Sequence, residues 1–183
     1  MKYEIQGDNL PVVICYLENG ETMVTEGGAM SWMGPNMKME RTSGGGFGKA
    51  LGRMFAGESM FMAHYTAEMN DAQIAFASNV AGSLIPIDVD LIPGMIIQKR
   101  AFLCAQDTVQ LETVFNKKAS VGFFGGEGFI MQQLRGSGLA FLEVDGDLVQ
   151  RDLQPGEVIK VDTGNLVGFS PSVKYEIETV KGL

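Results

Sequence analysis

The chain has 183 residues, a length that suits one domain or a few small units sharing a core. Hydrophobic residues make up 45% and charged residues 20%, which excludes a globally disordered chain. The formal net charge of −8 argues against broad nucleic-acid binding, because phosphate contacts need dense Lys and Arg.

The first unit is predicted to span residues 1–43. It starts with the polar stretch MKYEIQGDN, which is unlike a signal peptide, and no segment of the chain reaches the ~18 apolar residues of a spanning helix. We therefore expect a cytoplasmic protein. Cys15 lies in the apolar run VVICYL, and a turn follows at Leu17-Glu18-Asn19-Gly20. The unit ends with the alternating segment Met37-Lys38-Met39-Glu40.

A glycine-rich insert, GGGFGKALGRMFAG, occupies residues 44–57. Its apolar residues are spaced as on one face of a short helix, and two basic residues lie elsewhere on that helix. The segment lacks the Walker spacing of a phosphate-binding loop. Two interpretations remain open: the helix caps an open end of the fold and buries this face, or the face contacts a protein partner or a membrane surface. The residues concerned are Phe47, Lys49, Leu51, Arg53, Met54 and Phe55.

The second unit is predicted to span residues 58–115. Phe61, Ala63 and Tyr65 alternate with more polar residues that include His64, the single histidine of the chain. The pattern predicts a strand with a half-exposed histidine. Cys104 lies in the apolar run AFLCAQ, so we expect both cysteines to be buried free thiols.

A join at residues 116–126 leads to the third unit, residues 127–183. The join contains the apolar, glycine-rich string VGFFGG, which repeats the character of the first insert through Phe123 and Phe124. The two segments would take equivalent positions and form one apolar surface. The run Leu139–Val144 predicts a more buried strand, and Val173, Tyr175 and Ile177 alternate with charged residues as in a half-buried strand.

The three units share elements in the same order. Each has a Leu-x-x-Gly turn, ending at Gly20, Gly94 and Gly156, and an element of apolar, polar, apolar and acidic residues ending at Glu40, Glu112 and Glu176. Strand-length runs between such turns predict an all-β fold of three β-sandwich-like units. Each unit is too small to bury a core alone. We therefore expect one compact domain, residues 1–183, with a pseudo-threefold arrangement and a short helix in the 44–57 insert.

A catalytic or metal site has weak support in the sequence. His64 has Ser59, Ser78 and Asp71 near it in sequence, but nothing shows a nucleophile held by a base and an acid. Three carboxylates near a pseudo-threefold axis, from Glu40, Glu112 and Glu176, would suit a hard cation, whereas their repetition favours a structural role. We expect no enzyme, no metal and no cofactor.

The residues resemble a known family. GGGFGKALGRMFAGESMFM, FFGGEGFIMQQLRGSGLAFLEVDG and LQPGEVIKVDTGNLVGF are similar to segments of the bacterial family related to the fungal "altered inheritance of mitochondria" protein, with the Gly-x-Gly of Gly136 and Gly138 in the expected order. The resemblance implies an all-β, pseudo-threefold architecture similar to the tryptophan RNA-binding attenuation protein. It implies no established activity, although mitochondrial members are linked to inner-membrane organisation.

The sequence thus favours a non-enzymatic binding or scaffold protein that forms homo-oligomers. Phe47, Lys49, Leu51, Arg53, Met54, Phe55, Phe123 and Phe124 are the expected contact residues for a protein partner or a membrane surface. The alternative is a small-ligand-binding protein with a pocket near the pseudo-threefold axis. No nucleic-acid partner is expected.

Overall fold

The computed structural model describes residues 1–26, 28–43, 61–117 and 129–178. Within these residues the chain is almost entirely β-structure, as predicted, with two 3-10 helices of three residues each at Lys99–Ala101 and Thr163–Asn165. The strands are β1 (Lys2–Gln6), β2 (Val12–Leu17), β3 (Thr22–Glu26), β4 (Met30–Met33), β5 (Met37–Ser43), β6 (Phe61–Ala67), β7 (Ala72–Ala77), β8 (Gly82–Asp88), β9 (Ile96–Gln98), β10 (Phe102–Gln106), β11 (Val109–Lys117), β12 (Phe129–Gly136), β13 (Leu139–Asp145) and β14 (Gly168–Phe169).

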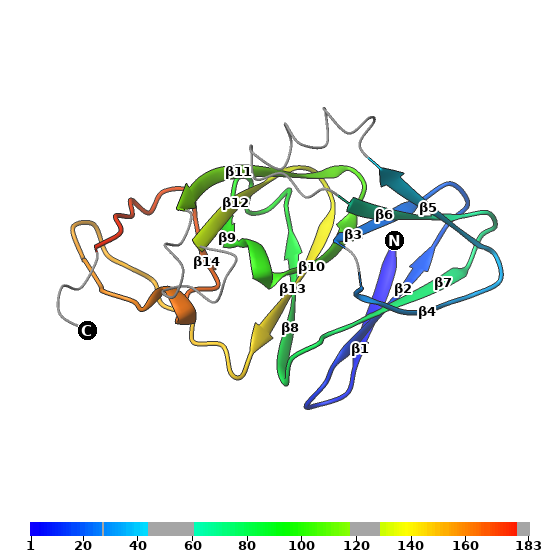
Figure 1. Ribbon diagram of the computed structural model, residues 1–183, viewed down its shortest axis with the longest axis horizontal. Helices are drawn as coiled ribbons and strands as arrows, with labels where there is room; N and C mark the ends of the chain where they lie inside the picture. Colours follow the sequence, from blue (N-terminus) through cyan, green and yellow to red (C-terminus); the bar gives the residue numbers. More distant parts are fainter. Residues whose placement is uncertain (27, 44–60, 118–128, 179–183) are drawn as a thin grey trace.

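Three antiparallel sheets are stacked along the molecule (Figure 1). Sheet A has the strand order β1-β2-β7-β4, sheet B the order β5-β6-β3-β10-β13-β8, and sheet C the order β11-β12-β9-β14. Strands from different predicted units share a sheet, because β3 of the first unit pairs with β10 of the second, and β10 pairs with β13 of the third. The units therefore interlock by strand pairing as well as by packing.

Sheet B separates two apolar cores. Phe141 of β13 packs into the first core, against residues of sheet A, whereas its neighbours Ala140 and Leu142 pack into the second core, between sheets B and C. Successive side chains of a strand point to opposite faces, so a strand covered on both faces reads as a continuous apolar run. This confirms the prediction of a more buried strand at Leu139–Val144, and the structure adds that the strand is buried on both faces.

The repeated Leu-x-x-Gly sequence has a backbone reason. Gly20, Gly94 and Gly156 have φ angles of 88°, 81° and 84°, a left-handed conformation that glycine adopts at no steric cost. In the first and third units the following Glu also closes the turn, because the carboxylates of Glu21 and Glu157 accept backbone N–H bonds at 2.9 and 3.0 Å. The turn of the third unit thus keeps the geometry of the first.

The third unit differs from the prediction at its strands. Val173, Tyr175 and Ile177 are half-buried and alternate with exposed residues, as expected, but the segment belongs to no strand of the described structure. Strand assignment needs a hydrogen-bonded neighbour, and the periodicity of one segment says nothing of whether that neighbour is present. The threefold relation of the units and the likeness to the attenuation protein stay predictions, and the expected helix at 44–57 lies outside the described residues.

Candidate functional site

The predicted contact residues all lie outside the described residues. They are Phe47, Lys49, Leu51, Arg53, Met54 and Phe55 of the 44–57 insert and Phe123 and Phe124 of the second join. The strands that lead into and out of these two segments are described, and they define where each segment leaves the fold.

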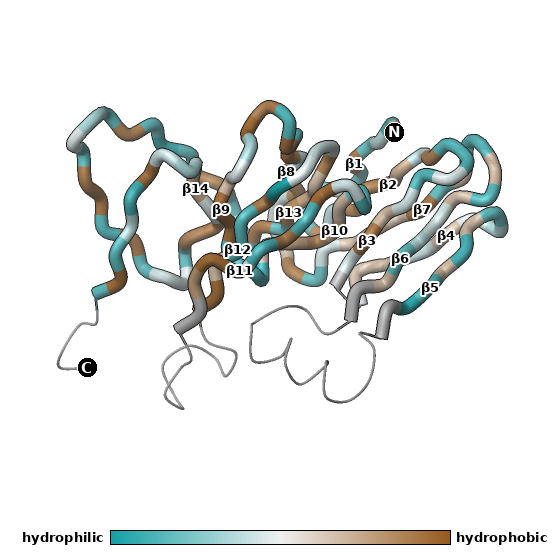
Figure 2. Tube along the Cα trace, turned by 90° about the horizontal axis from the view of Figure 1, so that it is seen from above, coloured by the Kyte–Doolittle hydropathy of each residue, from teal (hydrophilic) through white to brown (hydrophobic). Residues whose placement is uncertain are grey.

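Each segment connects the two strands of one antiparallel pair. Strands β5 and β6 pair as far as Ser43 opposite Phe61, and β11 and β12 pair as far as Lys117 opposite Phe129. The open ends of both pairs face the same side of the molecule, at the bottom of Figure 2. The two apolar, glycine-rich segments therefore leave the fold on one side.

Basic residues continue from the insert into β5, where Lys38 is paired with an acid. The Nζ atom of Lys38 lies 2.7 Å from a carboxylate oxygen of Glu40, and both side chains are exposed. This hydrogen bond raises the pKa of Lys38 and lowers the pKa of Glu40. The pair adds no net charge, so the net positive charge of residues 37–57 comes from Arg41, Lys49 and Arg53.

His64 lies half-buried on β6, as predicted, opposite Glu40 of β5 and Val24 of β3. Of the residues considered for a triad, Ser78 is not its hydrogen-bond partner. The hydroxyl of Ser78 instead lies 3.0 Å from a carboxylate oxygen of Glu143. Ser59 lies outside the described residues.

Two of the three repeated acids have ion pairs, each with a different partner. Glu40 pairs with Lys38, and Glu112 lies 2.5 Å from Nε of Arg135, whereas Glu176 is exposed. In the described ranges, no group of three or more His, Cys, Asp or Glu side chains is arranged to hold a metal ion. Both ion pairs are exposed, so they add little to stability, and the structural role of the repeated acids stays a prediction.

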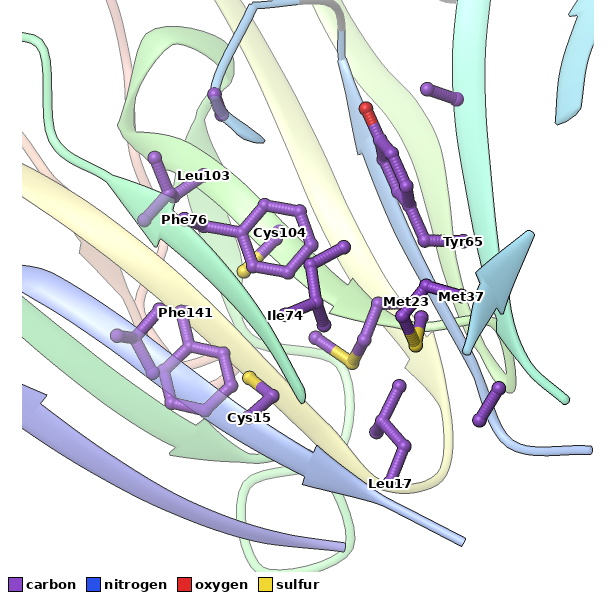
Figure 3. Packing of buried hydrophobic residues seen from close by; sticks show 14 of the residues in the cluster. Cys15, Leu17, Met23, Met37, Tyr65, Ile74, Phe76, Leu103, Cys104 and Phe141 are labelled. Carbon is purple, nitrogen blue, oxygen red and sulfur yellow. The ribbon is translucent and has the colours of Figure 1, made fainter. Parts of the chain in front are cut away.

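Both cysteines are buried free thiols, as predicted, and they lie in the first core (Figure 3). Burial raises the pKa of the Cys15 thiol to about 12 and that of Cys104 well above its ordinary value. The thiols are therefore protonated at neutral pH and are poor nucleophiles and metal ligands.

Alkaline pH should destabilise the protein through these thiols. In the unfolded chain they ionise near the ordinary pKa of 9.0, whereas the folded chain keeps their protons to a higher pH. The folded state then binds more protons, so stability falls as the pH rises from about 9 towards about 12, by at most about 1.4 kcal/mol per thiol and pH unit.

Urea unfolding of the wild type and of a Cys15→Ala/Cys104→Ala variant, at about pH 7 and about pH 10, measures this effect. The variant controls for the lysines and tyrosines that also titrate. We expect the wild type to lose more stability than the variant between the two pH values, and equal losses would refute the prediction.

A shallow hollow of about 450 Å³ lies beside β12, lined by Pro93, Gly94, Gln133, Arg135 and Gly136. Its polar side chains already have partners, because Gln133 donates to the Gly94 carbonyl at 3.0 Å and Arg135 pairs with Glu112. Gln132, which precedes Gln133, is buried, and its amide oxygen has no hydrogen-bond partner among the described residues. The sequence did not single out Gln132, since two adjacent glutamines in a strand give no sign of which face is buried.

No helix in the described ranges has the length and apolarity needed to cross a bilayer. No protein of curated function matches the chain. In structure it is similar to SPYM3_0169, a Streptococcus pyogenes protein solved by X-ray crystallography, with a TM-score of 0.61 and 23% identity over 80% of this chain. The match spans 65% of that protein, so the chain corresponds to only part of its length, and the likeness concerns the fold alone.

A family model described as mitochondrial biogenesis AIM24 matches residues 3–183, nearly the whole sequence. This agrees with the resemblance read from the glycine-rich segments and from the Leu-x-x-Gly turns. The chain therefore belongs to the mitochondrial biogenesis AIM24 family.

Proposed function

We propose that this protein is a non-enzymatic scaffold that contacts a protein partner or a membrane surface through its two glycine-rich apolar segments, 44–57 and 121–126. The observation that carries the proposal is the placement of the strand ends. The pairs β5–β6 and β11–β12 open on the same side of the molecule, so both segments leave the fold towards one surface (Figure 2).

The composition of the segments supports contact with an apolar or anionic surface. Phe47, Leu51 and Phe55 supply large apolar groups, and Lys49 and Arg53 supply positive charge on a chain that is acidic as a whole. Large apolar groups combined with basic residues are the features by which short segments bind membrane interfaces and grooves of partner proteins.

The test replaces Phe47, Leu51 and Phe55 by Ser. Each apolar side chain removed from water contributes about 1.5–3 kcal/mol, so we expect binding to fall at least about tenfold. Flotation with vesicles containing anionic lipid measures membrane contact, and pull-down from a lysate with defined washes measures protein contact. Loss of flotation identifies a membrane surface, and loss of captured protein with unchanged flotation identifies a protein partner.

The matched control replaces three exposed apolar residues elsewhere, Leu10, Met69 and Leu91, by Ser. This variant should bind as the wild type does, because the proposed contact depends on the apolar residues of the 44–57 segment. It does not depend on exposed apolar residues elsewhere on the surface. If the Phe47, Leu51 and Phe55 variant behaves as the wild type in both assays, the proposed contact surface is wrong.

Small-ligand binding is the second candidate. The sequence analysis expected such a pocket near the pseudo-threefold axis. The hollow beside β12 supports small-ligand binding at a different kind of place, because its glycine backbone and the Arg135 guanidinium would suit a small anion. It is the weaker candidate because Gln133 and Arg135 already bond within the protein. Thermal shifts in a screen of small metabolites, lost on replacing Arg135 by Ala, would favour it.

A further inference from the structure

Strand β4 ends sheet A, so its outer edge pairs with no strand of the described residues. It carries Trp32 and Met33, of which 41% and 37% remain exposed. An apolar edge strand exposes both unpaired backbone N–H and C=O groups and apolar side chains, and proteins normally cover such an edge. The strand pairings of the other two units show what covers the equivalent edge there.

In the second unit, β10 takes the place of β4 and pairs with β3 of the unit before it. Gln106 of β10 lies opposite Met23 of β3. Gln106 is twelve residues after Gly94, the turn glycine of its own unit. Met23 is three residues after Gly20, the turn glycine of the preceding unit.

The third unit repeats the same pairing. Gly168 of β14 lies opposite Ile97 of β9. Gly168 is twelve residues after Gly156, and Ile97 is three residues after Gly94. Both pairings are antiparallel and obey one rule: the residue twelve after a turn glycine faces the residue three after the turn glycine of the unit before it.

Among the described residues, no strand pairs with the outer edge of β4 in this way. We now apply the rule to the first unit and take the third unit as the one that precedes it. Trp32, twelve residues after Gly20, then faces Ile159, three residues after Gly156. The same count places Met33 opposite Val158. The register can also be counted from the alternating element that ends at Glu40, Glu112 and Glu176, which begins two residues closer to the turn glycine in the second unit than in the other two. Counted in this way, Trp32 lies opposite Val161. The two registers differ by two residues, so Ile159 and Val161 lie on the same face of the segment.

Residues 158–161 have the properties of the missing strand. They belong to no strand of the described structure, and 82% of Val158 and 48% of Val161 are exposed. The turn before them has the φ angle and the Glu carboxylate bond of the turn that leads into β3. Residues 158–161 thus follow their turn in the same way as β3 follows its own. Strand β3 pairs with β10, whereas residues 158–161 pair with no strand of the described structure.

In this structure, β4 and residues 158–161 lie too far apart to pair within one chain. Strand β4 lies at one end of its longest axis, and the segment between β13 and β14 lies at the opposite end, in both views (Figures 1 and 2). We propose that the outer edge of β4 in one copy of the chain binds residues 158–161 of a second copy as an antiparallel strand. Each copy then has one donor and one acceptor, so association is head-to-tail and produces a closed ring or a filament.

The test uses two variants that each remove one half of the contact. Val158→Lys/Ile159→Lys changes the donor, which lies outside the strands, and Trp32→Lys changes the acceptor edge. By sedimentation velocity the wild type should be oligomeric over a range of concentrations, and each variant alone should be monomeric. An equimolar mixture of the two should form dimers and nothing larger, because one intact donor meets one intact acceptor.

A Leu91→Lys variant is the control, since Leu91 is exposed and lies outside both edges; it should sediment as the wild type does. Circular dichroism of each variant shows whether it is folded, and the donor variant alone decides the matter if the Trp32 variant fails to fold. A monomeric wild type would overturn the proposal, as would a donor variant of wild-type size or a mixture that stays monomeric. If residues 158–161 paired with β4 of the same chain, the wild type would be monomeric.

Discussion

Replacing Gly136 by Ala should cost about 3 kcal/mol or more of unfolding free energy. Gly136 ends β12 with a φ angle of 86°, and a Cβ atom placed on it would lie 2.1 Å from the backbone carbonyl oxygen of Thr108. A side chain is strained at this φ angle, and the clashing atom belongs to the backbone, which cannot move without breaking the β11–β12 pairing.

Gly146 provides the matched comparison, because its φ angle is 77° but nothing lies within 4 Å of the position that a Cβ atom would take there. Gly146→Ala should cost only the conformational strain, about 1 kcal/mol. Urea unfolding of both variants separates strain from clash, since the difference between their midpoints reports the clash alone. Two equal, small losses would show that the Thr108 carbonyl moves freely.

Replacing Phe141 by Ala should have an effect of similar size for a different reason. Phe141 is fully buried in the first core, and its ring packs edge-on against Tyr3 with 5.0 Å between the ring centres. Phe→Ala changes in cores cost about 3–5 kcal/mol, because apolar contact is lost and a cavity remains. For a chain of this size, the melting temperature should fall on the order of 10 °C.

Scanning calorimetry measures the change for Phe141→Ala and for the control Leu91→Ala. Leu91 is 78% exposed, so its truncation should change stability by no more than about 0.5 kcal/mol. Strand β13 contributes side chains to both cores, so the Phe141 variant should also melt in one transition. Two separate transitions would mean that the cores unfold independently, contrary to the shared sheet B.

Local sequence patterns predicted the all-β class, the turns and the burial of single strands. The Leu-x-x-Gly turns could be predicted because only glycine adopts their φ angle easily, and Leu139–Val144 because a strand covered on both faces must be apolar throughout. Strand partners could not be predicted in the same way. The pairing of β3 with β10 joins residues about eighty positions apart, and no local pattern encodes which edges meet.

The candidate site shows the same division. Burial of Cys15 and Cys104 and the half-buried position of His64 followed from their apolar or alternating surroundings. The bond between Ser78 and Glu143 did not, because these residues are brought together by the packing of different strands. The contact residues in 44–57 and 121–126 stay predictions, and the described strand ends add only that both segments leave the fold on one side.

The interlocked sheets affect how the chain folds as it is synthesised. Strand β2 pairs with β7, and β3 with β10, so the first unit cannot complete either sheet until most of the second has left the ribosome. Folding dominated by such distant contacts is slow, and the unpaired edges of the early strands are exposed to aggregation meanwhile. A fragment that contains one predicted repeat should therefore have no stable fold of its own, so the unit that recurs in the sequence is smaller than the unit that folds.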